Sequence, residues 1–301
     1  MEHIDLALQR RLDSLGKSIK ERNRMLEQQQ KAVVVQLDFW EDGRRAAPNV
    51  VFRSALFPAL KFKEGRPFLE EERIFSAKGI EVYFTGKQFD QSDLDVYLEL
   101  LNMARPVPLG TPIKFSAYSI LKALGRNTGK SDHEWLHSVL IRLRGGTVDM
   151  TDHKKRYFGG LIEGGFKDEI TKEYEISINP RFAVLFGFGM WSTLDRAQRR
   201  ALGRNQTAKA LHAYYSSHAA PGAHEYKTLA GLAGLTDKNP RKLKMKITAG
   251  HEELKRVGFL RDYEAGENTI AATINHTPGQ VRHIVKKAAK RRNRNPEKRT
   301  G

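Results

Sequence analysis

Five cations stand close together between residues 238 and 246, in a stretch that reads KNPRKLKMK and contains no acidic residue. Lys and Arg side chains neutralise phosphate groups, and the free N–H groups at a helix N-terminus also attract anions. This combination is typical of a helix that contacts nucleic acid. An ordinary solvated helix face is the alternative, although such faces usually mix charges of both signs.

A helix must position these cations. Asn239 is a suitable N-cap and Pro240 a suitable first residue, and Gly258 ends the helix soon after Arg256. Apolar residues at helical spacing then form one buried face, namely Leu243, Ile247, Leu254 and Val257. The candidate DNA-binding residues on and beside the opposite face are Lys238, Arg241, Lys242, Lys244, Met245, Lys246 and Thr248.

The elements around this helix fit a DNA-binding fold. A short helix over residues 226–234 precedes it, and the polar turn 236–238 joins the two. A hairpin follows, with its turn at residues 265–268. Helix, turn, helix and a two-stranded wing is the pattern of a winged-helix domain, whose second helix fits the major groove.

The same order of elements is predicted earlier, over residues 113–162. A short strand leads into a helix, a turn at 125–130 and a second helix to about Arg144, which Ser131 and Glu134 open as a capping box. The strands of the expected wing are residues 147–150 and 157–162. The candidate DNA-binding residues in this region are Lys130, Ser131, His133, His137 and Arg142.

These patterns predict an α+β fold with two tandem winged-helix domains, each a helix-turn-helix with a β-wing. An N-terminal helical and linear extension precedes them, and a basic C-terminal tail follows. The expected boundaries are 1–50 for the extension, 51–190 and 191–277 for the domains, and 278–301 for the tail. The tail has nine Lys or Arg after residue 280 against one Glu, a composition that predicts disorder and nonspecific binding to polyanions.

The extension contains a predicted helix over residues 1–31 and then a short segment with the pattern of a binding peptide. This segment is Gln36, Leu37, Asp38, Phe39 and Trp40. It resembles the linear peptide by which bacterial replication proteins dock on the sliding clamp, although the usual peptide ends in Leu-Phe. In the alternative interpretation, the apolar side chains of the segment attach the N-terminal helix to the body of the protein.

The composition limits the class of protein. With 301 residues and 40% hydrophobic residues, the chain is long enough for two folded domains. The formal net charge of +17 points to a polyanionic partner, either nucleic acid or an anionic membrane surface. The longest apolar run has about ten residues, whereas a membrane span needs about 20, and the N-terminus has no apolar signal core. The sequence therefore predicts a cytoplasmic protein with no membrane partner.

No catalytic, metal or cofactor site stands out. The stretch Gly125–Ser131 resembles a phosphate-binding P-loop, but it has three residues between its glycines where four are required, and it follows a helix. His212, Tyr214 and Tyr215 share one helix, but the metal-binding histidine pair of tyrosine nickases is missing. The chain has no cysteine and no HExxH motif to form a zinc site. We therefore expect no enzymatic activity and no cofactor.

Four short tracts occur in an order that resembles segments of the TrfA family of plasmid replication initiators. These tracts are RSALF at 53–57, VYFTG at 82–86, PLGTPIKF at 108–115 and YYSSH at 214–218. The basic helix and apolar strand over residues 238–259 are similar in character to the same family. The likeness covers roughly residues 50–270, and the family also tends to carry a clamp-type peptide before its core.

The resemblance implies an initiator that binds direct repeats, called iterons, at a plasmid origin of replication. Such proteins help to open the adjacent AT-rich DNA and recruit the host initiator, the replicative helicase and the sliding clamp. Many exchange between a monomer and a homodimer, and they carry no enzymatic site. A two-domain winged-helix transcriptional repressor is the alternative interpretation, and a DNA relaxase or nuclease is a third.

Overall fold

The computed structural model describes residues 40–62, 65–152 and 155–294, with five further positions, 17, 20, 21, 36 and 37, before them. The chain divides after Gln36, and every named helix and strand lies in the second compact unit, Leu37–Gly301. Most of the helix expected over residues 1–31 therefore lies outside the described residues. The second compact unit includes residues 37–50, which the sequence assigns to the extension.

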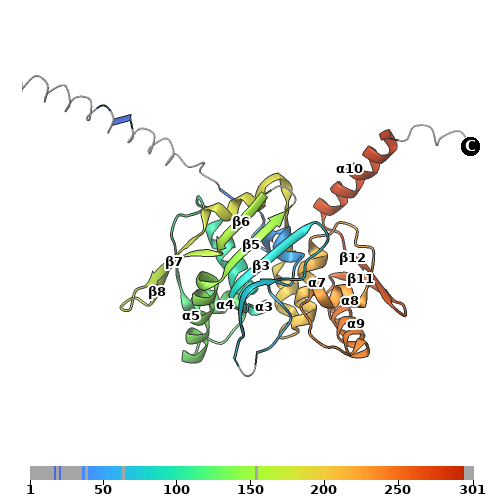
Figure 1. Cartoon of the computed structure of the whole chain (residues 1–301), viewed down its shortest axis with the longest axis horizontal. Helices are drawn as coiled ribbons and strands as arrows, with labels where there is room; N and C mark the ends of the chain where they lie inside the picture. The colour runs from blue at the N-terminus through green and yellow to red at the C-terminus, as the bar shows by residue number, and fades with distance from the viewer. Residues whose placement is uncertain are drawn as a thin grey trace, which may run out of the picture. The chain divides into compact units, whose positions relative to one another are not determined.

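Figure 1 labels many of the helices and strands, which follow one another along the chain in a mixed α+β order. They are β1 (Arg44–Pro48), α2 (Asn49–Phe52), β2 (Phe68–Arg73), β3 (Ile80–Lys87), α3 (Gln91–Ala104), β4 (Ile113–Ser116), α4 (Ala117–Leu124), α5 (Lys130–Gly145), β5 (Thr147–Asp152), β6 (Lys155–Gly160), β7 (Ile162–Lys167), β8 (Glu173–Ile178), the 3₁₀ helix η1 (Pro180–Gly189), β9 (Trp191–Asp195), α6 (Arg196–Ala201), α7 (Gln206–Ser216), β10 (Ala223–Glu225), α8 (Tyr226–Leu232), α9 (Pro240–Arg256), β11 (Leu260–Ala265), β12 (Thr269–Ile274) and α10 (Pro278–Arg294).

The first winged-helix unit consists of α3, β4, α4, α5, β7 and β8. Asp90 caps α3 in a capping box with Asp93, and Gly125 ends α4 in the left-handed conformation, at φ 69°. The helix pair is α4 and α5, and the strands pair in the order β4-β8-β7. The wing of this unit is therefore the hairpin β7–β8, because its second strand pairs with the strand that precedes the helix pair.

The hairpin that the sequence predicts as this wing forms, but it lies elsewhere. Its strands are β5 and β6, and they extend a separate sheet with the order β2-β3-β5-β6. Val148, Met150 and Tyr157 alternate inward from these strands and are buried. The prediction of a wing at 147–162 is wrong because two hairpins follow α5, and only the long-range pairing with β4 distinguishes them.

The second winged-helix unit consists of α7, β10, α8, α9, β11 and β12. Its strand order, β10-β12-β11, repeats that of the first unit, and the short helix, the long helix and the hairpin predicted from the sequence are confirmed. Leu211, Tyr215, Ile247 and Leu254 belong to its buried core. The helices α7 and α9 pack closely, since a Cβ at Gly250 would lie 2.8 Å from Leu211 Cδ1.

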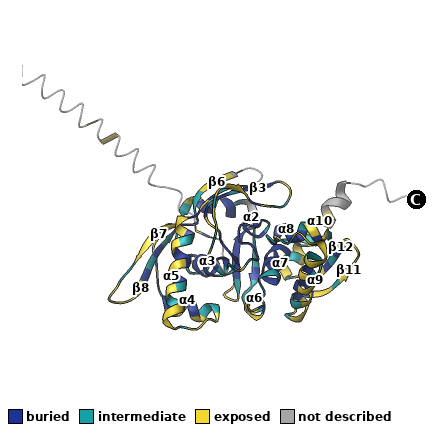
Figure 2. Cartoon of the chain, turned by 60° about the horizontal axis from the view of Figure 1, so that its bottom comes forward, coloured by how far each residue is buried: buried dark blue, intermediate teal, exposed yellow. Residues whose placement is uncertain are grey.

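Two further features connect these units. The strands β1 and β9 pair antiparallel, with Arg44 opposite Asp195. The helices α6 and α7 follow one another closely, and Gly203 adopts φ 57° in the turn between them. Figure 2 shows α3 and α7 mostly buried, whereas α5 and α9 each present an exposed face.

The described part of the predicted disordered tail is a helix, α10. Thr277 and Gln280 cap it reciprocally: the N–H of Thr277 donates to Gln280 Oε1 at 2.9 Å, and the N–H of Gln280 donates to Thr277 Oγ1 at 3.3 Å. Ala, Lys and Arg then favour the helical backbone. The expectation of disorder is thus wrong for residues 278–294. It was based on the charge composition and did not consider the local cap.

Candidate nucleic-acid interface

The N-terminus of α9 is fixed by its cap. Asn239 Oδ1 accepts hydrogen bonds from the N–H groups of Arg241 at 2.9 Å and Lys242 at 3.4 Å, and Pro240 occupies the first helical position. The cap and the start of the helix are as the sequence predicts. The basic stretch from residue 238 to 246 therefore begins at the positive end of the helix dipole, where anions are favoured.

The cations of this stretch face outward. Ile247 and Leu254 are buried on the opposite side of α9, and Leu243 packs against the same core. The exposed side chains are Lys238, Arg241, Lys242, Met245 and Lys246, with Thr248 and Lys244 half-buried. Within the described residues, Lys238, Arg241 and Lys242 form no ion pair, so their charge is available to a phosphate group.

Two of the predicted contact residues also have structural partners. Lys244 Nζ donates to the backbone oxygens of Gly266 and Glu267, both at 3.0 Å, and lies 5.2 Å from the ring centroid of Tyr226. Lys244 therefore ties α9 to the turn between β11 and β12. Lys246 is paired with Asp237, and this pair holds the pKa of Asp237 below its usual value.

The second helix of the first unit starts differently. α5 begins at Lys130 after Gly129, which provides no side-chain cap, so the predicted capping box at Ser131 and Glu134 is wrong. Ser131 lies within the first helical turn instead of before it. Gly129 adopts the extended conformation and the N–H of Asp132 donates to its carbonyl, so the helix starts two residues earlier than it would after a cap at Ser131.

The predicted contact residues on α5 do not form one free face. Lys130, Ser131 and His137 are exposed and His133 is half-buried. His137 Nδ1 lies 3.3 Å from the hydroxyl of Tyr174, which links α5 to β8 of the wing. Lys130 lies 3.9 Å from Glu134, so an acid accompanies the first cation of this helix.

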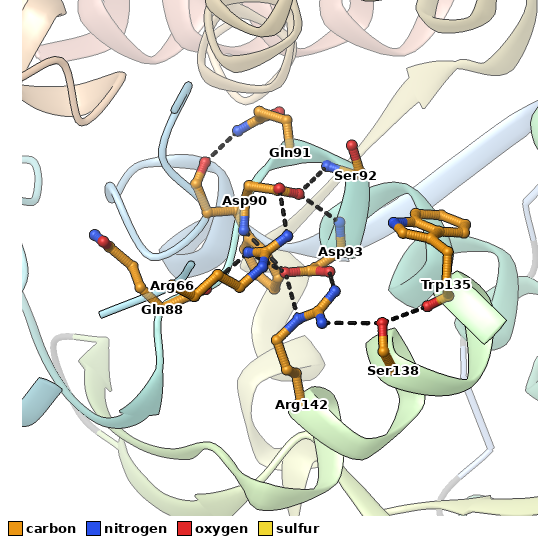
Figure 3. A network of polar contacts seen from close by, with 10 residues as sticks. Arg66, Gln88, Asp90, Gln91, Ser92, Asp93, Trp135, Ser138 and Arg142 are labelled. Atoms are coloured by element: carbon orange, nitrogen blue, oxygen red, sulfur yellow. Dashed lines mark hydrogen bonds and ion pairs between the residues drawn. The ribbon is translucent and has the colours of Figure 1, made fainter. Parts of the chain in front are cut away.

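Arg142 is committed to a buried ion cluster. Its Nη2 donates to Asp93 Oδ1 at 2.7 Å, and Arg66 Nη1 reaches Asp93 Oδ2 at 3.1 Å. Figure 3 shows both guanidinium groups pointing at Asp93, and that of Arg66 also at Asp90, at the start of α3. Asp93 is fully buried, and its burial, together with the neighbouring Asp90 carboxylate, raises its pKa, although the two arginines oppose this shift. The geometry assigns Arg142 to holding α5 on α3, in place of the predicted role at the surface of α5.

The predicted clamp peptide lies partly outside the described residues, since Asp38 and Phe39 are not among them. Leu37 and Trp40 are buried. Trp40 is 4% exposed, its Nε1 donates to Asn102 Oδ1 at 3.0 Å, and its ring lies 6.0 Å from that of Trp191. These contacts favour the interpretation in which the segment attaches to the body, and clamp binding through Gln36–Trp40 stays a prediction.

Two features of the structure were not predicted from the sequence. The helix α10 carries seven Lys or Arg and no acid over residues 278–294, and Thr277 with Gln280 was the signal that could have identified it. The true wing of the first unit was also missed.

In the part of the chain that the structure describes, no group of three or more His, Asp or Glu side chains could hold a metal ion, and no helix is long and apolar enough to cross a membrane.

Comparison with known proteins gives one sequence family. The family profile described as TrfA protein matches residues 13–270. The plasmid replication initiator protein TrfA of Escherichia coli is 25% identical to the chain over 231 residues. This match takes in 73% of the chain and 59% of the relative, so the chain spans less than two thirds of the length of that protein.

Two solved structures have similar arrangements of elements. A structure of domains 2 and 3 of RctB covers 76% of this chain and 98% of its own, with a TM-score of 0.49 and 11% identity. The structure of the Pi initiator protein in complex with iteron DNA covers 62% of this chain and 95% of its own, with a TM-score of 0.45 and 10% identity.

Proposed function

Because the chain belongs to the TrfA family, we propose that it is a plasmid replication initiator that binds repeated sequences in the DNA of a replication origin. The observation that carries this proposal is the basic N-terminal half of α9. Lys238, Arg241 and Lys242 are exposed and form no ion pair within the described residues, and they stand at the capped end of the helix. A helix of this kind is suited to the major groove, where its cations contact phosphates and base edges.

The mechanism that we propose uses binding free energy alone. Phosphate contacts position the second winged-helix unit on the duplex, and side chains such as Arg241 and Met245 select the sequence at base edges. The wing turn, held by Lys244, supports the helix from the side. We propose that the protein has no catalytic step, and that opening of AT-rich DNA follows from the bound state.

The remaining parts of the proposal concern place and partners. We propose that the protein works in the cytoplasm on double-stranded origin DNA, and that it recruits a host initiator, the replicative helicase and the sliding clamp. A homodimer is the proposed inactive form. These statements rest on the family, and the burial of Trp40 implies that clamp binding would require this side chain to leave its site.

A fluorescence-anisotropy titration tests the origin-binding function. The probes are duplexes that tile the DNA flanking the gene of this protein, each compared with a scrambled duplex at two salt concentrations. We expect tight, selective binding to a repeated element, and we expect Arg241→Ala to weaken it by about 1–3 kcal/mol. The matched control is Lys87→Ala, which removes an exposed cation from the end of β3.

Two outcomes would count against this function. Equal, steeply salt-dependent binding to every duplex would mean that the positive charge attracts DNA without reading a sequence. Selective binding that Arg241→Ala and Lys87→Ala weaken equally would remove α9 from the interface. Selective binding to an operator beside the gene, with no repeats, would favour a repressor.

A further inference from the structure

A basic cavity lies between the two winged-helix units, away from the exposed face of α9. Its volume is about 570 Å³. The first unit lines it with α3, the end of α4, the loop that follows and the start of α5, and the second unit lines it with α7. The helix α6, the loop between α6 and α7, and the residues Arg45, Lys61 and Leu194 complete the lining. Eight Lys or Arg line it against three Asp or Glu, which leaves a formal charge of +5.

The acids of the cavity are already paired. Asp95 accepts from Arg199 Nε at 2.5 Å and Lys209 Nζ at 2.6 Å. Burial raises the pKa of Asp95, but the attraction of these two cations outweighs it, and the pKa lies below the usual value. Glu99 accepts in the same way from Arg45 at 2.8 Å and Arg196 at 3.2 Å. These ion pairs occupy the acids of the cavity wall.

The remaining cations have no such compensation. Lys61, Arg200 and Arg204 are exposed, line the cavity and form no ion pair among the described residues. Arg200 lies directly against the loop of the first unit, because a Cβ at Gly125 would stand 2.8 Å from its Nη2. On the same loop Arg126 pairs with Asp132 at 3.0 Å and stacks 3.7 Å from the ring centroid of Trp135. Unpaired cations around one hollow concentrate its positive potential.

One polar group in the cavity wall also lacks a partner. Gln206 Oε1 is buried and accepts no hydrogen bond within the described residues. A buried acceptor left without a donor costs free energy, and a hydroxyl or amino group of a bound molecule would satisfy it. The cavity thus offers cations for phosphate oxygens and an acceptor for a neighbouring donor.

We propose that this cavity binds a small polyphosphate ligand, of which a nucleoside triphosphate is the representative. The volume falls within the range of about 300–1,000 Å³ that is usual for small-molecule sites. The loop that starts at Gly125 contributes three lining residues, Gly125, Arg126 and Asn127. Because residues of both units line the site, the ligand bridges them.

Isothermal titration calorimetry on the full chain tests this proposal, with ATP and inorganic triphosphate as probes at matched ionic strength. We expect heat of binding with at least one probe, and a loss of affinity of at least about tenfold in the double variant Arg200→Ala, Arg204→Ala. The double variant Lys78→Ala, Lys87→Ala removes the same formal charge from exposed positions on the β2–β3 hairpin. It should bind like the parent protein.

Lys61→Ala provides a second test from a separate segment, and thermal unfolding checks that each variant is folded. No binding of either probe, or equal binding by the cavity and control variants, would overturn the proposal. Loss of duplex binding in the cavity variant, without any binding of small phosphates, would assign the cations to the DNA backbone and also overturn it. Selective DNA binding is measured separately, so failure here leaves the origin-binding function standing.

Discussion

The two winged-helix units have the same order of helices and strands, but they use their charged residues differently. In the second unit, Lys238, Arg241 and Lys242 project from the capped start of α9 and form no ion pair among the described residues. In the first unit, Arg142 points inward to Asp93, and the first turn of α5 contains an acid. The shared topology therefore fixes the position of the second helix in each unit. Ion pairing determines how many cations of that helix are free to bind phosphate.

The wings of the two units also differ in the partners of their lysines. Lys244 fastens the β11–β12 turn to α9 through two backbone oxygens. In the β7–β8 turn, Glu169 accepts from Lys167 and Lys172, both at 2.9 Å, and Ile170 at the tip is 92% exposed. The first wing thus neutralises its own cations and offers an apolar tip. We infer that the second unit carries most of the sequence-specific affinity.

The largest expected effect concerns the buried cluster of the first unit. Asp93→Ala leaves Arg66 and Arg142 half-buried without their shared acid, and we expect the free energy of unfolding to fall by about 3–5 kcal/mol. Urea denaturation measures it. The control is Asp149→Ala, which breaks an exposed pair with Arg156 and should change little. Similar losses in both variants would mean that the cluster is no more structural than a surface pair.

A matched lysine pair tests the difference in DNA contact. Lys242 and Lys130 are exposed and lie in the first turn of equivalent helices. We expect Lys242→Ala to weaken binding and to reduce the slope of log affinity against log salt by about 1, because a phosphate contact is lost. Lys130→Ala should change both less. Anisotropy titrations at several salt concentrations measure both quantities. Equal slopes in the two variants would contradict the predicted difference between α9 and α5.

The stability of the second unit should depend on pH in the acidic range. Burial lowers the pKa of His212, His224 and His251, and lowers that of His218 to about 4. A histidine whose folded pKa lies below its unfolded value of about 6.5 stabilises the fold above pH 6.5 and loses that contribution as the pH falls toward the folded pKa. Stability of the second unit should therefore decline between about pH 6.5 and 4.

The variant His212→Leu tests how much one of these histidines contributes to the pH dependence of stability. Both ring nitrogens of His212 are buried without hydrogen-bond partners in the described structure, so an apolar replacement should be neutral or stabilising by about 1 kcal/mol at pH 7. The decline on acidification should become shallower by about 1.4 kcal/mol per pH unit, the value for one proton. Thermal or urea unfolding from pH 7 to 4 measures both quantities. An unchanged slope would show that His212 does not titrate on unfolding.

The smallest expected effect concerns the contact between Lys244 and the β11–β12 turn. Lys244→Met keeps an apolar stem beside Tyr226 but removes the ammonium that holds the turn, and we expect selective binding to weaken by about 1 kcal/mol. Hydrogen exchange at residues 266–268 should become faster. Lys246→Met removes a neighbouring cation that does not contact the wing. Faster exchange in that control as well would refute a specific role for Lys244.

The sequence predicts α9 and its hairpin well because the deciding residues are local. Asn239, Pro240 and Gly258 fix the ends of the helix within the helix's own neighbourhood. The wing of the first unit depends on pairing between β4 and β8, about 60 residues apart, and no local pattern distinguishes it from the preceding hairpin. The role of Arg142 likewise depends on Asp93, 49 residues earlier. Long-range partners, and not residue types, limited the prediction of this candidate site.

The pairing of β1 with β9 has a consequence for how the protein is made. Arg44 and Asp195 face each other across 151 positions of sequence, so β1 has no partner strand until the ribosome has released that much more chain. At typical synthesis rates of about 5–20 residues per second, this interval lasts roughly 8–30 s. The buried strand Arg44–Pro48 stays without its ladder during that time. Slow synthesis or early termination would expose it to chaperones and to other nascent chains.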